Sequence, residues 1–215
     1  MLQKKDNKII FGTTGAFMAA KLIINFPHRD VYMRELANET GLSTTSIADG
    51  INILEKYKII KVKDSLVTKN IQANMDSEAY RHYKIIFNLY RIMRYNVIGL
   101  LINFFNNPEC ISIFGSFAKG EDIEESDIDI LIISPYNPKN KELGSFIATI
   151  EKEFNRKINL HVLSSLDKAD NSFKNSLANG IILHGYLKVI WLIDKFENYL
   201  NLGKAKKKTP DISEA

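Results

Sequence analysis

The chain has 215 residues, of which 45% are hydrophobic, and a formal net charge of +4; this is enough apolar sequence for two small folded domains. No apolar run reaches the roughly 18 residues that a membrane-spanning helix needs, and the start of the chain lacks the pattern of a secretory signal, so we expect a cytoplasmic protein with no membrane partner. The single cysteine, Cys110, excludes an internal disulfide and a cysteine-based zinc site, and it is expected to be a small, buried hydrophobic residue.

Residues 1–76 are predicted to form three helices followed by two strands, because apolar residues recur first at helical spacing and then in short β-prone runs. The helices are expected at Phe11–Phe26, Met33–Glu39 and Ser43–Lys56, and the strands at Ile59–Lys63 and Leu66–Lys69. Ser43 or Thr44 is the expected N-cap of the third helix. This order, with Glu-Leu-Ala in the second helix and Gly-Leu-Ser in the turn, resembles the winged helix-turn-helix family.

The winged-helix resemblance implies a surface that can meet duplex DNA. Hydroxyl and amide groups on or near the exposed face of the third helix can contact phosphates or base edges; the candidates are Thr44, Thr45, Ser46 and Asn52. Asp49 on the same face would repel phosphate, and a net charge of +4 is modest for a nucleic-acid binder. Winged helices also serve in dimers and protein contacts, so double-stranded DNA, a protein partner and a homodimer all remain open.

Residues 77–105 are expected to form a helical linker, either one long helix or two helices broken near Gly99. Apolar side chains recur at helical spacing and predict a stripe that packs in a core or in a dimer seam: Tyr83, Phe87, Tyr90, Val97, Leu101 and Phe104. The basic side chains of the segment are expected on a solvated face or, alternatively, along the path of a polyanionic acceptor; they are Arg81, Lys84, Arg91 and Arg94.

Residues 106–202 are predicted to form an α/β domain with a small mixed sheet, and the stretch from 111 to 134 is its most informative part. The apolar run Cys110–Phe114 suits a buried strand. Gly115 and Ser116 follow directly, so the backbone can turn there and come close to a ligand. Backbone N–H groups and a hydroxyl at such a turn can hold phosphate oxygens.

Two aspartates follow the polar loop Lys119–Ser126. Asp127 and Asp129 would point to the same face of a strand, because side chains two residues apart share a face. Their mutual repulsion could be offset by a divalent cation such as Mg²⁺, which binds hard oxygen ligands. The alternative is a solvated edge strand that begins with two charges, but the strongly apolar residues after Asp129 favour a metal site.

The Gly-Ser pair and the Asp-x-Asp pair, in this order and spacing, resemble the nucleotidyltransferase superfamily that includes DNA polymerase beta and kanamycin nucleotidyltransferase, over about residues 97 to 186. The resemblance implies transfer of a nucleoside monophosphate from an NTP to an acceptor, with two Mg²⁺ ions held by three carboxylates. The implied triphosphate ligands are Gly115 and Ser116, with Lys119 and Ser126 as further nucleotide-binding candidates, and the implied metal ligands are Asp127 and Asp129.

The third carboxylate of this family lies on a later strand, and here the position is occupied by Asn159. Lys141–Phe154 reads as the intervening helix, and Lys157–Leu163 reads as the strand. An amide oxygen can coordinate a cation, but it carries no charge and cannot act as a general base. His161 would point to the same face as Asn159, either as a half-exposed strand histidine with a backbone partner or as an assisting group.

The end of the chain is expected to hold a last strand at Asn179–Gly185, an amphipathic helix at Tyr186–Leu202 and a disordered basic tail at 203–215. The sequence therefore predicts an α+β protein with a winged helix, a helical linker and a nucleotidyltransferase domain. The leading function is Mg²⁺-dependent nucleotidyl transfer with Asp127, Asp129 and Asn159 at the catalytic site. The alternatives are a DNA-binding regulator with a catalytically weak nucleotide site, and an antitoxin-like protein with a toxin partner or protein acceptor.

Overall fold

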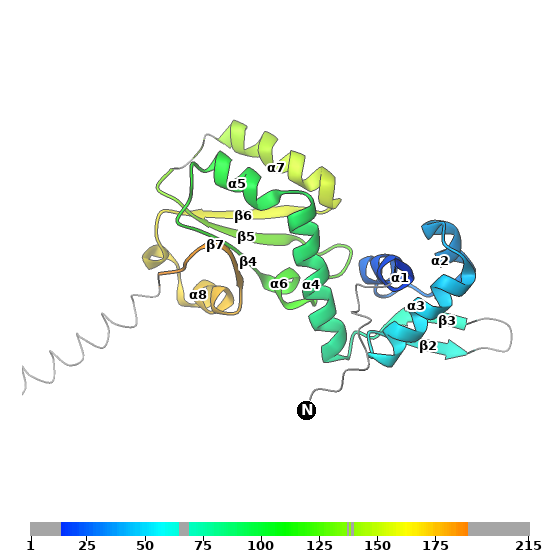
Figure 1. The fold of residues 1–215 in the computed structure, drawn as a ribbon. Coiled ribbons are helices and arrows are strands. Elements are labelled where there is room, and N and C mark those ends of the chain that lie inside the picture. Colours follow the sequence, from blue (N-terminus) through cyan, green and yellow to red (C-terminus); the bar gives the residue numbers. More distant parts are fainter. Residues whose placement is uncertain (1–13, 65–68, 137, 139, 189–215) are drawn as a thin grey trace, which may run out of the picture.

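The computed structural model describes residues 14–64, 69–136, 138 and 140–188, which form an α+β molecule with two separate sheets (Figure 1). The N-terminal part packs three helices against an antiparallel sheet whose strand order is β1-β3-β2. These elements are α1 (Thr14–Asn25), β1 (Val31–Tyr32), α2 (Met33–Thr40), α3 (Thr44–Lys56), β2 (Ile60–Asp64) and β3 (Lys69–Ala73). Their shared core includes Ile23, Leu36, Ile47, Leu54 and Ile71, all fully or almost fully buried.

The helices of this part lie close to their predicted positions. Ser43 is the N-cap of α3, since its hydroxyl accepts a hydrogen bond of 3.2 Å from the backbone N–H of Ser46. Helix α2 ends at Gly41, whose φ of 69° is left-handed. For the predicted first helix, Phe11 to Thr13 lie outside the described residues.

The strand predicted at Leu66–Lys69 overlaps the described strand β3 only at Lys69, because β3 spans Lys69–Ala73. In β3 the buried side chains of Ile71 and Ala73 alternate with Asn70 and Gln72, which are only partly buried. Polar residues at alternate positions are expected in a sheet with one solvated face, and they concealed the strand in the sequence. Leu66 to Thr68 lie outside the described residues.

The segment predicted as a helical linker forms two helices, α4 (Glu78–Arg94) and α5 (Val97–Phe104), which meet at an angle of 56°. The break lies at Tyr95 and Asn96 and not near Gly99, because Asn96 takes a left-handed conformation with φ of 51° that ends the helical path. In the described parts of the chain no helix is both long and apolar enough to span a membrane by itself, and only this bent pair taken together passes that test.

Helix α4 contributes to two hydrophobic cores. Tyr80, Tyr83 and Phe87 are buried with the N-terminal helices, whereas Ile92 is buried against the second sheet. The basic residues of α4 are not all on a solvated face, as the sequence suggested: the Lys84 side chain is only 1% exposed. The helix is thus a packed element between the two sheets.

The second sheet is mixed and has the strand order β6-β5-β4-β7, in which only β5 and β6 are parallel. Its elements are β4 (Cys110–Phe114), α6 (Gly115–Lys119), β5 (Ile128–Ile133), α7 (Asn140–Phe154), β6 (Ile158–Leu163), the short 3-10 helix at Leu166–Lys168, α8 (Asn171–Ala178) and β7 (Ile181–Gly185). Helices α5 and α7 cover one face and α8 covers the other (Figure 1). Cys110 is buried on the α8 face, as expected.

Three details of this part differ from the sequence prediction. The residues from Gly115 to Lys119 form a short helix where a turn and loop were expected, and α8 was not predicted. Tyr186 to Lys188 have no regular secondary structure, so the predicted closing helix does not begin at Tyr186. The remainder of that helix and the basic tail lie outside the described residues.

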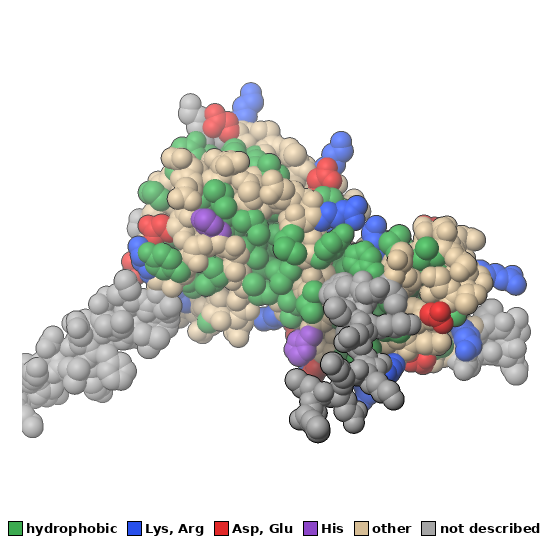
Figure 2. Space-filling view, in the orientation of Figure 1, with side chains coloured by type: hydrophobic (Ala, Val, Ile, Leu, Met, Phe, Trp, Pro, Cys, Tyr) green, Lys and Arg blue, Asp and Glu red, His purple; other side chains and the backbone are tan. Residues whose placement is uncertain are grey.

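Hydrophobic side chains gather over the region of α4 on the face shown in Figure 2. Ile86, Met93 and Ile182 are 46%, 66% and 48% exposed, and they help to line an apolar groove of about 490 Å³ between α4, α5 and β7. Such a patch is typical of contact surfaces. The sequence leaves a homodimer open, and the structure does not test it.

Candidate functional site

The candidate site begins where strand β4 ends. Phe114 pairs with Asp129 on the antiparallel neighbour β5, so the turn after β4 lies directly beside the Asp129 side chain. Gly115 occupies this turn with φ of 70°, and a Cβ atom there would overlap Oδ2 of Asp129. Only glycine fits both the left-handed backbone and the close approach of the carboxylate.

Asp127, Asp129 and Asn159 come together at the start of the parallel pair β5 and β6. The pairing register sets Asp129 opposite Asn159. The side-chain nitrogen of Asn159 donates to Oδ2 of Asp127 at 3.1 Å and to Oδ1 of Asp129 at 3.2 Å. Because both carboxylates reach the same nitrogen atom, their oxygens converge on one point, as the sequence pattern predicted.

This point suits a cation bound by oxygen. Two carboxylates converge there, and the only positive group that they share in the described contacts is the weakly positive amide N–H₂ of Asn159. The Asn159 side chain can also turn its oxygen toward a cation, since the amide oxygen and nitrogen occupy similar positions. No group of three His, Cys, Asp or Glu side chains is placed to hold a metal within the described ranges, so any cation here needs further ligands from water or substrate oxygens.

His161 lies on the same side of β6 as Asn159 but one pleat further along. Its Nε2 atom is 3.8 Å from Oδ1 of Asp129, and its side chain is 39% exposed. The ring packs between Phe114 and Phe173, with centroid distances of 5.2 Å to each. These aromatic contacts hold the ring beside the aspartate.

The other predicted nucleotide-binding residues lie in different surroundings. Ser116 is the second residue of the α6 helix, directly after Gly115, and is half-buried. Lys119 is exposed and lines a polar hollow between α4 and α6 with Arg81 and His82; Asp127, Asp129 and Asn159 do not line it. The Ser126 hydroxyl accepts a hydrogen bond of 3.0 Å from the backbone N–H of Ile123, so it stabilises the loop before β5.

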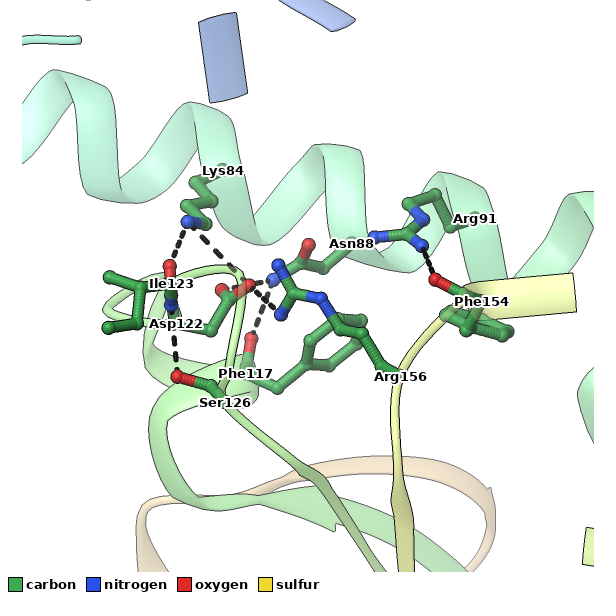
Figure 3. A network of polar contacts seen from close by, with 9 residues as sticks. All are labelled: Lys84, Asn88, Arg91, Phe117, Asp122, Ile123, Ser126, Phe154 and Arg156. Atoms are coloured by element: carbon green, nitrogen blue, oxygen red, sulfur yellow. Dashed lines mark hydrogen bonds and ion pairs between the residues drawn. The ribbon is translucent and has the colours of Figure 1, made fainter. Parts of the chain in front are cut away.

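A buried polar cluster beneath this loop was not recognised in the sequence (Figure 3). Arg156 donates to Oδ2 of Asp122 at 2.6 Å, Asn88 donates to Oδ1 at 2.9 Å, and Lys84 donates to the backbone carbonyl of Asp122. Burial lowers the pKa of Lys84, and the Asp122 carboxylate opposes this shift. Lys84, Asn88 and Arg91 lie along one face of α4, but this spacing does not distinguish a buried polar face from a solvated one.

The candidate DNA-binding residues divide into two groups. Thr44, Thr45 and Asn52 are exposed on α3. Ser46 is partly buried and lies toward α1, where a Cβ atom on Gly15 would overlap its backbone oxygen. Ser46 therefore lies at the contact between the two helices and presents less surface than the sequence suggested.

The family comparison matches the part of the chain that contains the second sheet. Residues 96–186 match the family model described as polymerase beta, nucleotidyltransferase, whereas no curated protein sequence matches the chain. Among solved structures, a toxin-antitoxin complex with AMP-PNP is 20% identical over 52% of this chain and 90% of that one, with a TM-score of 0.38. The toxin-antitoxin MntA-HepT is 18% identical over 53% and 89%, with a TM-score of 0.34.

The matched stretch contains the candidate site residues Gly115, Ser116, Asp127, Asp129 and Asn159. The family match covers less than half of the chain and does not include the three N-terminal helices. Residues 96–186 are therefore similar to a nucleotidyltransferase domain of the polymerase beta type.

Proposed function

We propose that residues 96–186 bind a nucleoside triphosphate with Mg²⁺ and transfer its nucleoside monophosphate to an acceptor. The observation that carries this proposal is the convergence of Asp127 and Asp129 on one atom of Asn159, directly beside the glycine turn at 115. A polar turn and two carboxylates at one place supply both parts of a metal-nucleotide complex with ligands.

Each residue has a distinct role in this proposal. Gly115 lets the backbone approach the triphosphate, and Ser116 supplies a backbone N–H and a hydroxyl for its oxygens. Asp127 and Asp129 hold the cation, and Asn159 orients both carboxylates through its amide hydrogens. Mg²⁺, when bound, neutralises charge on the phosphates and favours departure of pyrophosphate.

Asn159 is the residue that we expect to limit the rate of transfer at this site. A neutral amide neither attracts a second cation strongly nor accepts a proton from the acceptor hydroxyl. His161 is the nearest basic group among the described contacts, but it lies 3.8 Å from Asp129 and is packed between aromatic rings. We therefore expect nucleotide binding to be well preserved and transfer to be slow.

For the N-terminal part we infer a winged helix that contacts duplex DNA, which gives the regulator as the second candidate function. The order α2, turn, α3 and the β2-β3 hairpin support this assignment, and Thr44, Thr45 and Asn52 are exposed on α3. Exposed hydroxyls and amides at these positions can contact phosphates and base edges. A regulator of this kind would bind nucleotide without requiring rapid turnover.

The proposed function is tested by incubating the protein with each α-labelled NTP, Mg²⁺ and cell extract. We expect label to move onto an acceptor, and the acceptor is then identified from the labelled band. An Asp127→Asn/Asp129→Asn variant keeps the side-chain shapes but removes the charges, so it should transfer no label. Label on a protein would favour the antitoxin-like alternative, whereas equal labelling by both proteins would contradict the assigned site.

A further inference from the structure

The polar cluster around Asp122 contains more charge than a protein interior usually holds. The side chains of Lys84 and Asp122 are each 1% exposed, and that of Arg156 is 6% exposed. One carboxylate therefore faces two cationic side chains, with Nζ of Lys84 at 3.6 Å and a guanidinium nitrogen of Arg156 at 2.6 Å from Oδ2. Asn88 completes the group by donating to both Asp122 and the carbonyl of Phe117, at 2.9 Å each.

The cluster joins the segments that carry the proposed metal ligands (Figure 3). Asp122 lies in the loop that leads from α6 to Asp127, and Arg156 lies in the turn that leads from α7 to β6 and Asn159. The two segments meet again nearer the site, where the backbone N–H of Ile128 donates to the carbonyl of Lys157 at 2.9 Å. The ion pair thus fixes the start of β5 against the start of β6.

Helix α4 holds this junction from one side. Lys84 donates to the backbone carbonyl of Asp122, and Asn88 binds the loop and the α6 helix at once. A Cβ atom on Gly120, at the beginning of the loop, would overlap the backbone oxygen of Arg81 in the same helix. Loop and helix are therefore in direct backbone contact, and the loop has little freedom to shift.

Stability alone does not account for such a cluster. Desolvation of charged groups is costly, and well-packed apolar side chains of similar volume are often equally or more stabilising than a buried ion pair. Polar groups with directional hydrogen bonds do, however, fix one arrangement of the segments that they join, which apolar contacts do less well.

We propose that Asp122 is a positioning residue of the nucleotide site, which sets the separation of Asp127, Asp129 and Asn159 through Arg156 and Asn88. This inference rests on the proposed function of residues 96–186. It predicts that the geometry of the site can be lost while the fold survives, because the cluster determines how β5 and β6 start and the apolar cores determine whether the domain folds.

The test uses Mn²⁺ with labelled ATP as the probe, and the labelled ATP retained with the protein in equilibrium dialysis reports binding. Four full-length variants are compared with the wild type below their melting temperatures. Asp127→Asn/Asp129→Asn removes the metal ligands, and Asp122→Asn removes the central charge. Lys84→Met/Asp122→Leu/Arg156→Met replaces the cluster by apolar groups. Ile150→Ala creates an ordinary core defect in α7, where Ile150 is 3% exposed.

The account predicts at least tenfold weaker Mn²⁺-ATP binding for Asp122→Asn and for the apolar triple variant. The triple variant should nevertheless melt at a higher temperature than Asp122→Asn, since it leaves no uncompensated cation. Ile150→Ala should lose stability and keep its affinity. If the triple variant does not fold, the positioning role is tested by comparing the Mn²⁺-ATP affinities of Asp122→Asn and Ile150→Ala.

Two negative results can be told apart: one contradicts the proposed function, and the other contradicts the positioning role of Asp122. If the wild type does not bind Mn²⁺-ATP, or binds it no better than Asp127→Asn/Asp129→Asn, the proposed function fails and not the role of Asp122 specifically. If the wild type binds in an aspartate-dependent way but Asp122→Asn binds equally well, or loses no more affinity than Ile150→Ala, the positioning role is overturned.

Discussion

A Cβ atom on Gly115 would overlap Oδ2 of Asp129 and would lie 3.4 Å from Cγ of the same side chain. The glycine turn and the carboxylate are therefore in direct contact, although a helix and a loop separate them in the sequence. This contact explains in physical terms why the Gly-Ser pair and the Asp-x-Asp pair occur together. In the proposed site, the turn that would approach the phosphates therefore packs directly against the proposed metal ligand Asp129.

Gly115→Ala should therefore disable the site. The methyl group would displace the Asp129 carboxylate, and an alanine at φ of 70° costs roughly 1 kcal/mol of backbone strain. We expect the variant to melt at a lower temperature and to lose most of its stabilisation by MgATP in a thermal-shift assay.

The matched control is Gly144→Ala on the exposed side of α7, where an added Cβ has no neighbour within 4 Å. Alanine in a helix interior should raise stability by roughly 0.5–1 kcal/mol and leave the MgATP response unchanged. A Gly115→Ala protein that responds to MgATP as the control does would argue against the contact with Asp129.

Asn159→Asp should increase transfer activity. The new carboxylate can attract a second cation and accept a proton from the acceptor, and restoring a few kcal/mol of transition-state stabilisation corresponds to roughly a hundredfold in rate. Turnover of α-labelled NTP measures the effect, with His161→Ala as the companion variant.

The same substitution should make the free protein more dependent on cation. It removes the two hydrogen bonds that Asn159 donates to the aspartates and places a third negative charge beside them. The melting temperature in EDTA should fall, and Mg²⁺ should restore it. Rapid wild-type transfer that neither Asn159→Asp nor His161→Ala alters would show that the third ligand lies elsewhere.

Much of the site could be predicted because its parts are short and local in sequence. The run Cys110–Phe114 is buried on both faces and so reads as continuous apolar sequence, and the strand period places Asp127 and Asp129 together. Asn159 was located because the resemblance implies a third ligand on the strand after a helix, and the apolar spacing of that helix is clear. The short α6 helix was missed, since five residues beginning with glycine carry no helical period.

The cluster at Asp122 could not be predicted, because its members are brought together only by the tertiary fold. Lys84, Asp122 and Arg156 belong to separate elements, and each resembles an ordinary surface charge in the sequence. In the sequence, a basic helix face that is exposed to solvent looks the same as one that pairs with an aspartate far away along the chain. Burial of Lys84 depends on where the loop from 120 to 126 packs, which no local period encodes.

If the proposed winged helix binds a duplex, its affinity should fall steeply as salt rises, because lysine and arginine side chains that neutralise phosphates release counterions. The triple substitution Thr44→Ala/Thr45→Ala/Asn52→Ala should weaken binding without lowering the melting temperature, since all three side chains are exposed. Fluorescence anisotropy at several salt concentrations measures both effects.

Thr149→Ala is the matched control, since it removes an exposed helical threonine from the second domain. It should leave the affinity for duplex DNA at the wild-type value. Duplex binding that is indifferent to salt and to the triple substitution would identify the N-terminal part as a protein-contact module.

Alkaline pH should destabilise the protein through groups that are buried in the protonated form. Burial raises the pKa of the Cys110 thiol and the pKa values of Tyr80 and Tyr83 above their usual ranges. Their contribution to stability is complete below the unfolded-state pKa values, roughly 8.5 for cysteine and 10 for tyrosine, and is lost as the pH rises toward the folded-state values.

The melting temperature should therefore fall progressively above about pH 9. At pH 8 the Cys110 thiol should react with a disulfide reagent only as fast as the protein opens. Immediate and complete labelling of the native protein would contradict the burial of Cys110 on β4.

The central claim is that Asp127 and Asp129 hold the cation of a bound nucleotide, and thermal unfolding with MgATP tests it most directly. A ligand that binds only the folded state stabilises it by about 2.7 kcal/mol at a hundred times its dissociation constant. The wild type should therefore melt at a higher temperature with MgATP, and EDTA should abolish most of the increase. For Asp127→Asn/Asp129→Asn we predict little increase with MgATP, although removal of the repulsion can stabilise the free protein. Equal increases in the two proteins would contradict the claim.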